Sequence, residues 1–332
     1  MGKTLIIAEA GINHNGSLKI ARKLIYSAAK CGADYIKFQT FKTDNLVLQN
    51  AKKAPYQKKN SKDTANQYKL LKSTELKKSD FISLKKCCKK VGIKFLSSPF
   101  DIESLNFLKN FDLDFIKIPS GEITNLPFLE RVGKLNRKVL LSTGMSTIHE
   151  IQRSINILVK NGTAKKNISL LQCNTAYPSP FVDANLKVIN KFQKKFQLNI
   201  GYSDHTLGIE ASIAAVALGA KIIEKHFTIN KKLVGPDHKA SLDPDEFANM
   251  VKAIRNVEVA LGSKKFVTKS EKKNVNAARK SIVVVKTIKK GDFFTEKNLS
   301  VKRPGNGVSP MKWYKYINKR SKKNYNPNKL LK

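Results

Sequence analysis

The feature that most constrains this chain is a regular alternation of short apolar runs with segments of helical spacing. Each run has the length of a β-strand, and the segments between them carry apolar residues on one helical face. A helix that begins after Ser17 and stops at Gly32, for example, would bury Leu24 and Ile25. The eight predicted strands are 4–10, 34–40, 93–99, 114–120, 138–143, 168–174, 198–203 and 221–227.

Eight such units in roughly 260 residues predict an α/β fold of the (β/α)8 TIM-barrel type. The alternative is a doubly wound sheet, which usually has five or six strands. A dinucleotide-binding version of that fold would need a glycine-rich loop after the first strand, and the sequence has none there.

The pattern changes after Gly262, where a polar stretch precedes short β-runs separated by Gly and Pro. We therefore predict a barrel domain at 1–262, a linker at 263–280 and a small second domain at 281–332. The connection at 41–79 is long, polar and rich in lysine, with one short helix-like run. Long connections at the strand exits of a barrel are typical lids or binding loops.

The net charge of +38 raises the question of a nucleic-acid partner. The lysines are spread over many helices, however, and no RNA-binding aromatic signature or helix-turn-helix pattern accompanies them. We interpret them as a solvated surface whose field attracts small anions, with neither nucleic acid nor membrane as a partner. Without a signal-peptide pattern or an apolar run long enough to span a bilayer, a soluble, cytoplasmic protein with reduced cysteines is expected.

Polar residues follow or end every predicted strand, which would be a poor way to build a core. Because the carboxyl ends of all barrel strands share one face, these side chains should gather there as an active site. They are Glu9, Lys37, Gln39, Ser97, Ser98, Lys117, Ser120, Glu122, Ser142, Thr143, Asn174, Thr175, Ser203, His205 and His226.

His205 and His226 end adjacent strands, so their imidazoles would be able to meet over one ion. Two nitrogen ligands with open positions suit a divalent metal that keeps part of its water. The alternative is that each histidine only caps its strand by hydrogen bonding.

Lys37 and Lys117, with the hydroxyls of Ser98, Ser120 and Ser142, suit a phosphate group. A buried structural ion pair and a Schiff-base lysine are the alternatives, but the histidine pair favours metal-assisted chemistry. Glu9, Glu122 and Asp237 are the available acid or base carboxylates; Asp237 lies in a loop and is the one best explained as a surface group.

A series of motifs resembles, in order and over nearly the whole chain, the bacterial sialic acid synthase family. The motifs are AEAGINHNGSL, KFQTF, FLSSPFD, KIPSGE, LSTGM, YSDHTLG, EKHFT, GPDHKASL and VKRPGNG. The resemblance implies a barrel followed by an antifreeze-like (SAF) domain. It also implies condensation of phosphoenolpyruvate with an N-acetylated hexosamine, giving a nine-carbon 2-keto acid and phosphate by carbon–oxygen cleavage.

Two substrate pairs fit this resemblance. The first is N-acetylmannosamine giving N-acetylneuraminate, and the second is a dideoxy-diacetamido hexose giving legionaminate or pseudaminate. His205 and His226 would ligate Mn2+, with Mg2+ or Co2+ as alternatives, and Glu122, Glu9 and Lys117 would be the catalytic residues. The residues that would surround the substrates are Lys37, Gln39, Asn60, Ser98, Ser120, Ser142, Asn174, Thr175, Tyr177, Ser203, Asp237 and Arg303.

Two positions depart from the family pattern. Ser98 stands where some members have Thr, and Thr175 aligns with an Asn of one member, which leaves the role of Asn174 open. Arg303 corresponds to an arginine that reaches the sugar from the neighbouring subunit, so a domain-swapped homodimer is implied. The rivals are a phosphoenolpyruvate-dependent aldose-phosphate synthase and a non-catalytic basic protein that binds nucleic acid or sugar.

Overall fold

The computed structural model describes residues 2–60 and 66–332, with only the backbone of residues 59 and 60. The chain divides after Leu261 into two compact units. Each unit is described by itself below.

The first unit contains the parallel strands that the alternation predicted. They follow the order β3-β2-β1-β8-β7-β6-β5-β4, and β3 and β4 at the two ends of this order contact each other, so the sheet nearly closes. This confirms the predicted (β/α)8 barrel. The strands are β1 (Leu5–Gly11), β2 (Tyr35–Thr40), β3 (Lys94–Pro99), β4 (Ile116–Ile118), β5 (Val139–Ser142), β6 (Ile168–Cys173), β7 (Asn199–Asp204) and β8 (Ile222–His226).

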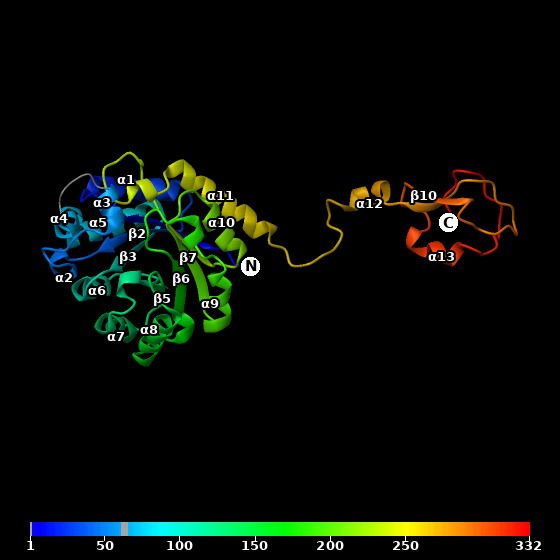
Figure 1. Ribbon diagram of the computed structural model, residues 1–332. Helices are drawn as coiled ribbons and strands as arrows, with labels where there is room; N and C mark the ends of the chain where they lie inside the picture. Colours follow the sequence, from blue (N-terminus) through cyan, green and yellow to red (C-terminus); the bar gives the residue numbers. More distant parts are fainter. Residues whose placement is uncertain (1, 61–65) are drawn as a thin grey trace. The chain divides into compact units, whose positions relative to one another are not determined.

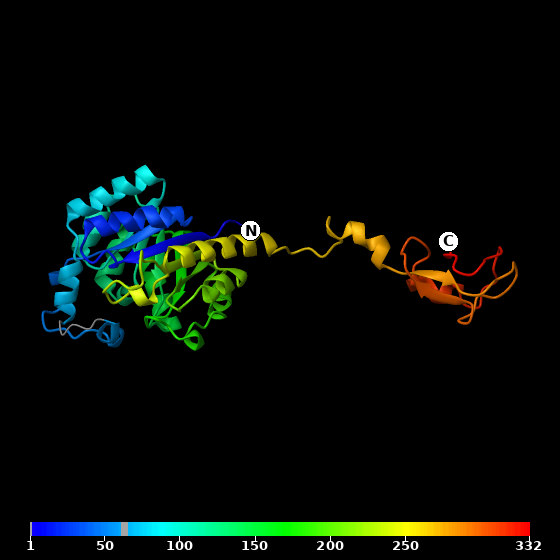
Figure 2. The ribbon, with the colours of Figure 1, turned by 90° about the horizontal axis from the view of Figure 1, so that it is seen from above.

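Helices surround the strands, and α1 packs between α5 and α11 (Figures 1 and 2). Local signals set their ends: Ser17 caps α1 by accepting from Ile20 N, and Asp243 forms a reciprocal capping box with Glu246 at the start of α11. The helices after successive strands are α1 (Leu18–Lys30), α5 (Lys78–Val91), α6 (Ile102–Leu108), α7 (Leu126–Lys134), α8 (Ile148–Lys160), α9 (Val188–Phe196), α10 (Glu210–Ala217) and α11 (Pro244–Ala260).

The long connection between β2 and β3 is more structured than its sequence suggested. Before α5 it holds three short helices, α2 (Thr43–Leu46), α3 (Pro55–Asn60) and α4 (Gln67–Thr74), where we expected one helix-like run. Asn66 caps α4 by accepting from Lys69 N. The sequence did not indicate these short helices, because tertiary contacts stabilise them and their lysine-rich composition has no periodic apolar pattern.

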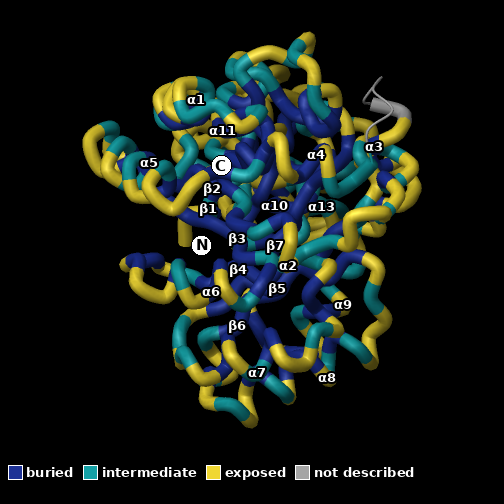
Figure 3. Tube along the Cα trace, turned by 90° about the vertical axis from the view of Figure 1, so that its left-hand side faces the viewer, coloured by how far each residue is buried: buried dark blue, intermediate teal, exposed yellow. Residues whose placement is uncertain are grey.

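Buried residues concentrate in the strands and on the inner faces of the helices (Figure 3). Most of the core lies between the strands and the helices. A second, smaller apolar layer fills the inside of the barrel and forms the floor beneath the strand exits. This floor consists of Ile7, Tyr35, Leu96, Leu140, Leu171 and Ile222.

One ion pair is sealed in the barrel wall. Lys225 in β8 and Asp204 in β7 have fully buried side chains, and Lys225 Nζ lies 2.9 Å from Asp204 Oδ2. Lys225 Nζ also donates to the Thr206 carbonyl at 2.6 Å. Each partner directly precedes one of the two histidines predicted to bind metal, so the pair ties together the strand ends that carry His205 and His226.

The second unit contains a two-stranded antiparallel sheet, β9 (Ser281–Val284) with β10 (Leu299–Lys302), and the short helix α13 (Trp313–Tyr316). Its own small core includes Ile282, Phe294 and Leu331. The segment expected as a linker holds helix α12 (Lys272–Ala278). In the part of the chain that the structure describes, no helix is long and apolar enough to cross a membrane.

Candidate active site

A pocket of about 300 Å³ opens at the carboxyl ends of the barrel strands. It lies directly above the apolar floor, because side chains two residues apart on a strand point to the same side. On β1, Ile7 belongs to the apolar floor, and Glu9, two residues later, lines the pocket. On β2, Tyr35 and Lys37 are related in the same way. The pocket therefore has a layer of polar side chains, the polar layer, directly above the apolar floor. This is the usual position of the active site in a (β/α)8 barrel.

Lys37 occupies the centre of this layer. Its Nζ lies 2.6 Å from Glu9 Oε2 and 3.7 Å from Glu224 Oε2, and it donates to Ser98 Oγ at 3.0 Å. Burial alone would lower the pKa of Lys37, but the two carboxylates outweigh it and raise this pKa. Lys37 is therefore a permanent cation.

Lys117 is held more weakly. Its Nζ donates to Ser142 Oγ at 2.7 Å and lies 3.7 Å from Glu224 Oε1, which also accepts from Ser203 Oγ at 3.0 Å. Burial lowers the pKa of Lys117, and Glu224 offsets only part of this effect. Burial would raise the pKa of Glu224, but Lys117 and Lys37 outweigh it and keep it low. Two ammonium groups thus face two carboxyl groups, and Lys117 is the cation that loses its proton more readily.

The two histidines meet as predicted. The ring centroids of His205 and His226 are 5.3 Å apart, and the Tyr177 ring stacks 4.1 Å from that of His205. His205 Nδ1 donates to the Asn174 carbonyl, which leaves Nε2 as a ligand nitrogen. Burial and the neighbouring His205 hold the pKa of His226 well below its usual value, so its ring is neutral, the form that binds metals.

A divalent ion fits this arrangement. His226 Nδ1 is buried without a hydrogen-bond partner among the described residues, and so is Asp237 Oδ1. Within residues 2–60 and 66–332 no group of three or more His, Cys, Asp or Glu side chains is spaced to hold a metal ion. The protein would then supply two ring nitrogens, as in sites that leave positions open for water and substrate.

Asp237 is not the surface carboxylate that its loop position suggested. Its side chain lines the pocket and is buried, and burial, with the nearby Glu9, raises its pKa to about 7. Burial likewise raises the pKa of Glu9, against the opposing effect of Lys37. Gln39 donates to Glu9 Oε1 at 3.2 Å. The pocket therefore has two carboxyl groups that hold protons more tightly than usual.

The structure separates two residues that the sequence left undecided. Thr175 lines the pocket, whereas Asn174 accepts from Ala176 N at 2.7 Å and stabilises the local turn outside the lining. Ser120 is also part of the lining, and its Oγ accepts from Gly144 N at 3.0 Å.

Of the remaining predicted residues, Glu122 is absent from the pocket lining, Arg303 lies in the second unit, and the side chain of Asn60 is not described. Glu122 follows Ser120 in a 3-10 turn and accepts from Asn125, the residue that caps α7, at 2.6 Å, so it is absent from the lining. Arg303 belongs to the second unit, where its Nε donates to the Ala278 carbonyl at 3.0 Å. The side chain of Asn60 lies outside the described residues.

Sequence reasoning missed Glu224 and Cys173, both of which line the pocket. The alternation in β8 was the available signal for Glu224, since this residue is two positions before His226 and faces the same side. Cys173 was expected only to be reduced, as the other cysteines were. Burial alone would raise the pKa of its thiol, but the adjacent His205 outweighs this and lowers it.

The fold and the site define a (β/α)8-barrel protein with a pocket of paired lysines and carboxyl groups at its strand exits, followed by a small β-domain. The chain belongs to the NeuB family, whose model matches residues 24–266, and an SAF domain matches residues 279–332. The family includes sialic, legionaminic and pseudaminic acid synthases.

Individual relatives match nearly the whole chain. N,N'-diacetyllegionaminic acid synthase of Campylobacter jejuni is 50% identical over 332 residues, covering 100% of this chain and 99% of the relative. The enzyme of the same name from Legionella pneumophila is 42% identical, covering 92% and 86%. The crystal structure of N-acetylneuraminic acid synthetase from Leptospira borgpetersenii, in complex with citrate, has a TM-score of 0.73 and 34% identity, covering 82% of this chain and 90% of that one.

Proposed function

We propose that this protein is a divalent-metal-dependent synthase that joins phosphoenolpyruvate to an N-acetylated hexosamine, giving a nine-carbon 2-keto acid and phosphate. The observation that carries the proposal is the convergence of two buried lysines and two neighbouring imidazoles on one pocket. The first set suits an enol phosphate, and the second suits the aldehyde of an acceptor sugar.

Phosphoenolpyruvate would lie on the polar layer. Lys37 and Lys117 would pair with its phosphate and carboxylate, and the hydroxyls of Ser98, Ser142 and Thr175 would complete the hydrogen bonds. Because these cations face Glu9 and Glu224 in the free protein, the substrate must compete with two carboxyl groups for them. We therefore expect the affinity of the protein for phosphoenolpyruvate to depend on a metal ion bound nearby.

His205 and His226 would hold that ion, with Mn2+ as our first choice and Mg2+ or Co2+ as alternatives. It would supply Lewis-acid stabilisation for the negative charge that develops on the aldehyde oxygen. The Tyr177 ring, stacked on His205, would fix the orientation of that imidazole and wall off one side of the acceptor.

The reaction moves protons at each step. When C3 of phosphoenolpyruvate bonds to the aldehyde carbon, the aldehyde oxygen takes up a proton; when water adds to C2, it gives one up. The bond between C2 and the bridging oxygen then breaks, the remaining proton of the C2 hydroxyl passes to the leaving phosphate, and the 2-keto group forms. Asp237, whose pKa is raised to about 7, is the candidate proton donor near neutral pH. Glu9, whose pKa is also raised, lies beside it, and Glu224, whose pKa is lowered, is the candidate acceptor.

For the acceptor we favour the dideoxy-diacetamido hexose, and so an N,N'-diacetyllegionaminic acid product. The support is that two relatives, 50% and 42% identical to this chain, are N,N'-diacetyllegionaminic acid synthases. N-acetylmannosamine with N-acetylneuraminate, and pseudaminate formation, are the alternatives.

The deciding experiment follows phosphate release and product mass from purified protein with Mn2+, phosphoenolpyruvate and each acceptor. Phosphoenolpyruvate labelled with 18O in the bridging position should release labelled phosphate, because carbon–oxygen cleavage leaves that oxygen on phosphorus. His226→Ala should keep the circular-dichroism spectrum but lose both turnover and Mn2+ binding, measured directly by titration. Salt-dependent DNA binding without any phosphate release would instead support a non-catalytic basic protein.

The domain-swapped homodimer can be tested by complementation. Arg303→Ala should raise the KM for the acceptor and leave phosphoenolpyruvate binding little changed. If Arg303 acts in the partner's site, random mixing of Arg303→Ala with His226→Ala subunits restores about a quarter of the sites, since each mixed dimer keeps one intact site. Mixtures that stay inactive, or an active monomer, would contradict the swapped arrangement.

A further inference from the structure

One side of the pocket is apolar. Its six side chains contact one another and line the cavity, and we call them the apolar wall: Ile12, Phe41, Leu46, Val47, Leu71 and Phe100. Three follow the ends of β1, β2 and β3, and the others come from α2, the residue after it, and α4. No side chain of this set can donate or accept a conventional hydrogen bond.

The apolar wall lies nearer the mouth of the pocket than the polar layer that contains Lys37. Phe41 comes two residues after Gln39 on the β2 side, and Phe100 comes two residues after Ser98 on the β3 side. The rings of Phe41 and Phe100 meet edge to face, with centroids 6.5 Å apart. A molecule lying over an anion on the lysines would thus have its outer part against the apolar wall.

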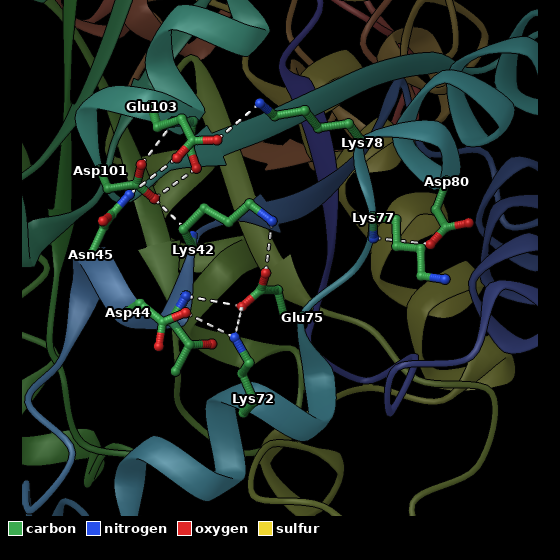
Figure 4. Close-up of polar contacts among 12 residues, drawn as sticks. Lys42, Asp44, Asn45, Lys72, Glu75, Lys77, Lys78, Asp80, Asp101 and Glu103 are labelled. Atoms are coloured by element: carbon green, nitrogen blue, oxygen red, sulfur yellow. Dashed lines mark hydrogen bonds and ion pairs between the residues drawn. The ribbon is translucent and has the colours of Figure 1, made fainter.

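Ion pairs and hydrogen bonds tie α2 to its neighbouring segments (Figure 4). Lys42 Nζ lies 2.9 Å from Glu75 Oε1, and Lys72 Nζ lies 2.9 Å from Asp44 Oδ2. The backbone N–H of Lys42 donates to Asp101 Oδ2 at 2.8 Å, which joins the start of α2 to the segment after β3. The apolar wall is therefore preorganised and does not have to be ordered by the ligand.

The chemistry of this surface distinguishes the possible acceptors. N-acetylmannosamine ends in a hydroxymethyl group. The favoured diacetamido acceptor is also deoxygenated at its last carbon, so it ends in a methyl group, and it carries a second acetamido group in place of a hydroxyl. A hydroxyl group of the acceptor that lay against the apolar wall would lose its hydrogen bonds to water and gain none from the protein. A phosphate group of an acceptor in the same place would lose more hydration free energy. Methyl groups would gain from burial there, while Gln39 and Gln67 line the adjoining part of the pocket and suit an amide.

We propose that the apolar wall is the specificity determinant of this protein, selecting an acceptor whose end remote from the aldehyde is deoxygenated. This inference rests on the proposed synthase activity and adds the residues that choose the acceptor. The competing explanation is that these side chains are only a small core beneath the connection between β2 and β3.

Two variants separate these explanations. Leu46→Asn introduces a polar group at a half-buried position of the apolar wall, and Val47→Thr adds a hydroxyl almost without a change of shape. Leu48→Asn is the matched control, because Leu48 is 77% exposed and does not line the pocket. For each protein the readout is the ratio of kcat/KM for the dideoxy-diacetamido hexose to kcat/KM for N-acetylmannosamine.

The unaltered protein should prefer the deoxygenated acceptor by about tenfold to a hundredfold, the range for one hydroxyl in an apolar site. Leu46→Asn should lower the ratio by about tenfold, Val47→Thr by a smaller factor in the same direction, and Leu48→Asn should leave it unchanged. Equal losses for both acceptors in the two wall variants would overturn the specificity role in favour of a structural one. Absence of phosphate release with either acceptor in the unaltered protein would refute the synthase activity itself, and with it this role.

Discussion

Replacing Lys225 with methionine should destabilise the barrel strongly, because it leaves a buried carboxylate without its counter-charge. Asp204 would keep three hydrogen bonds, from Thr206 N at 2.9 Å, Thr206 Oγ1 at 2.8 Å and Ser212 Oγ at 2.7 Å. Breaking a buried pair by removing one partner costs about 3–5 kcal/mol, and these remaining hydrogen bonds place Lys225→Met near the lower end, at about 3 kcal/mol.

The double variant Lys225→Met with Asp204→Asn removes both charges and should cost less than the sum of the single changes, with a coupling of about 2 kcal/mol. The assay is equilibrium urea unfolding followed by circular dichroism, with Lys252→Met, at an exposed position of α11, as the control expected to stay within about 0.5 kcal/mol. A cost below about 1 kcal/mol for Lys225→Met, or strict additivity in the double variant, would refute the reasoning. Weakened Mn2+ binding by the single variant is also expected, because Lys225 directly precedes His226.

Three further predictions concern pH and the pocket. Burial lowers the pKa of His14 from 6.5 to about 4; the unfolded chain therefore binds more protons between these values, and stability falls by about 2 kcal/mol from pH 7 to pH 5. His14→Asn should flatten this urea-midpoint profile, and an unchanged slope would exclude His14 as its source. Because an anion raises the lowered pKa of Lys117, phosphoenolpyruvate should bind more weakly as pH rises in alkaline buffer, an effect that titration of Lys117→Met should no longer show. Thr175→Ala should raise the KM for phosphoenolpyruvate while Asn174→Ala mainly lowers Tm, and the reverse result would exchange their assigned roles.

Much of the site was predictable because the carboxyl ends of all strands of a barrel lie on the same face. The meeting of His205 with His226, and the placement of Lys37 and Lys117 in one pocket, follow from strand order and alternation alone. Glu224 was equally accessible to the same rule, yet an acidic residue inside an apolar strand attracts less notice than the histidine after it.

The remaining features depend on geometry that spacing does not contain. Glu122 ends the 3-10 turn that begins at Ser120, and there it accepts from Asn125 and does not line the pocket. The apolar wall could not be predicted because Leu46 and Leu71 lie in a lysine-rich segment whose helices are fixed by ion pairs between distant residues. Asp237 was among the predicted substrate-binding residues and does line the pocket, but its loop position gave no sign that its side chain is buried.

The pairing of Lys37 and Lys117 with Glu9 and Glu224 has a consequence for turnover in the proposed reaction. A cavity lined only by cations would retain inorganic phosphate as firmly as the substrate and stall after each cycle. Here, once the carbon–oxygen bond has broken, Glu9 and Glu224 can pair with the two lysines again. This competition weakens the binding of inorganic phosphate and favours its release. The groups that weaken the first encounter thereby clear the way for the next molecule.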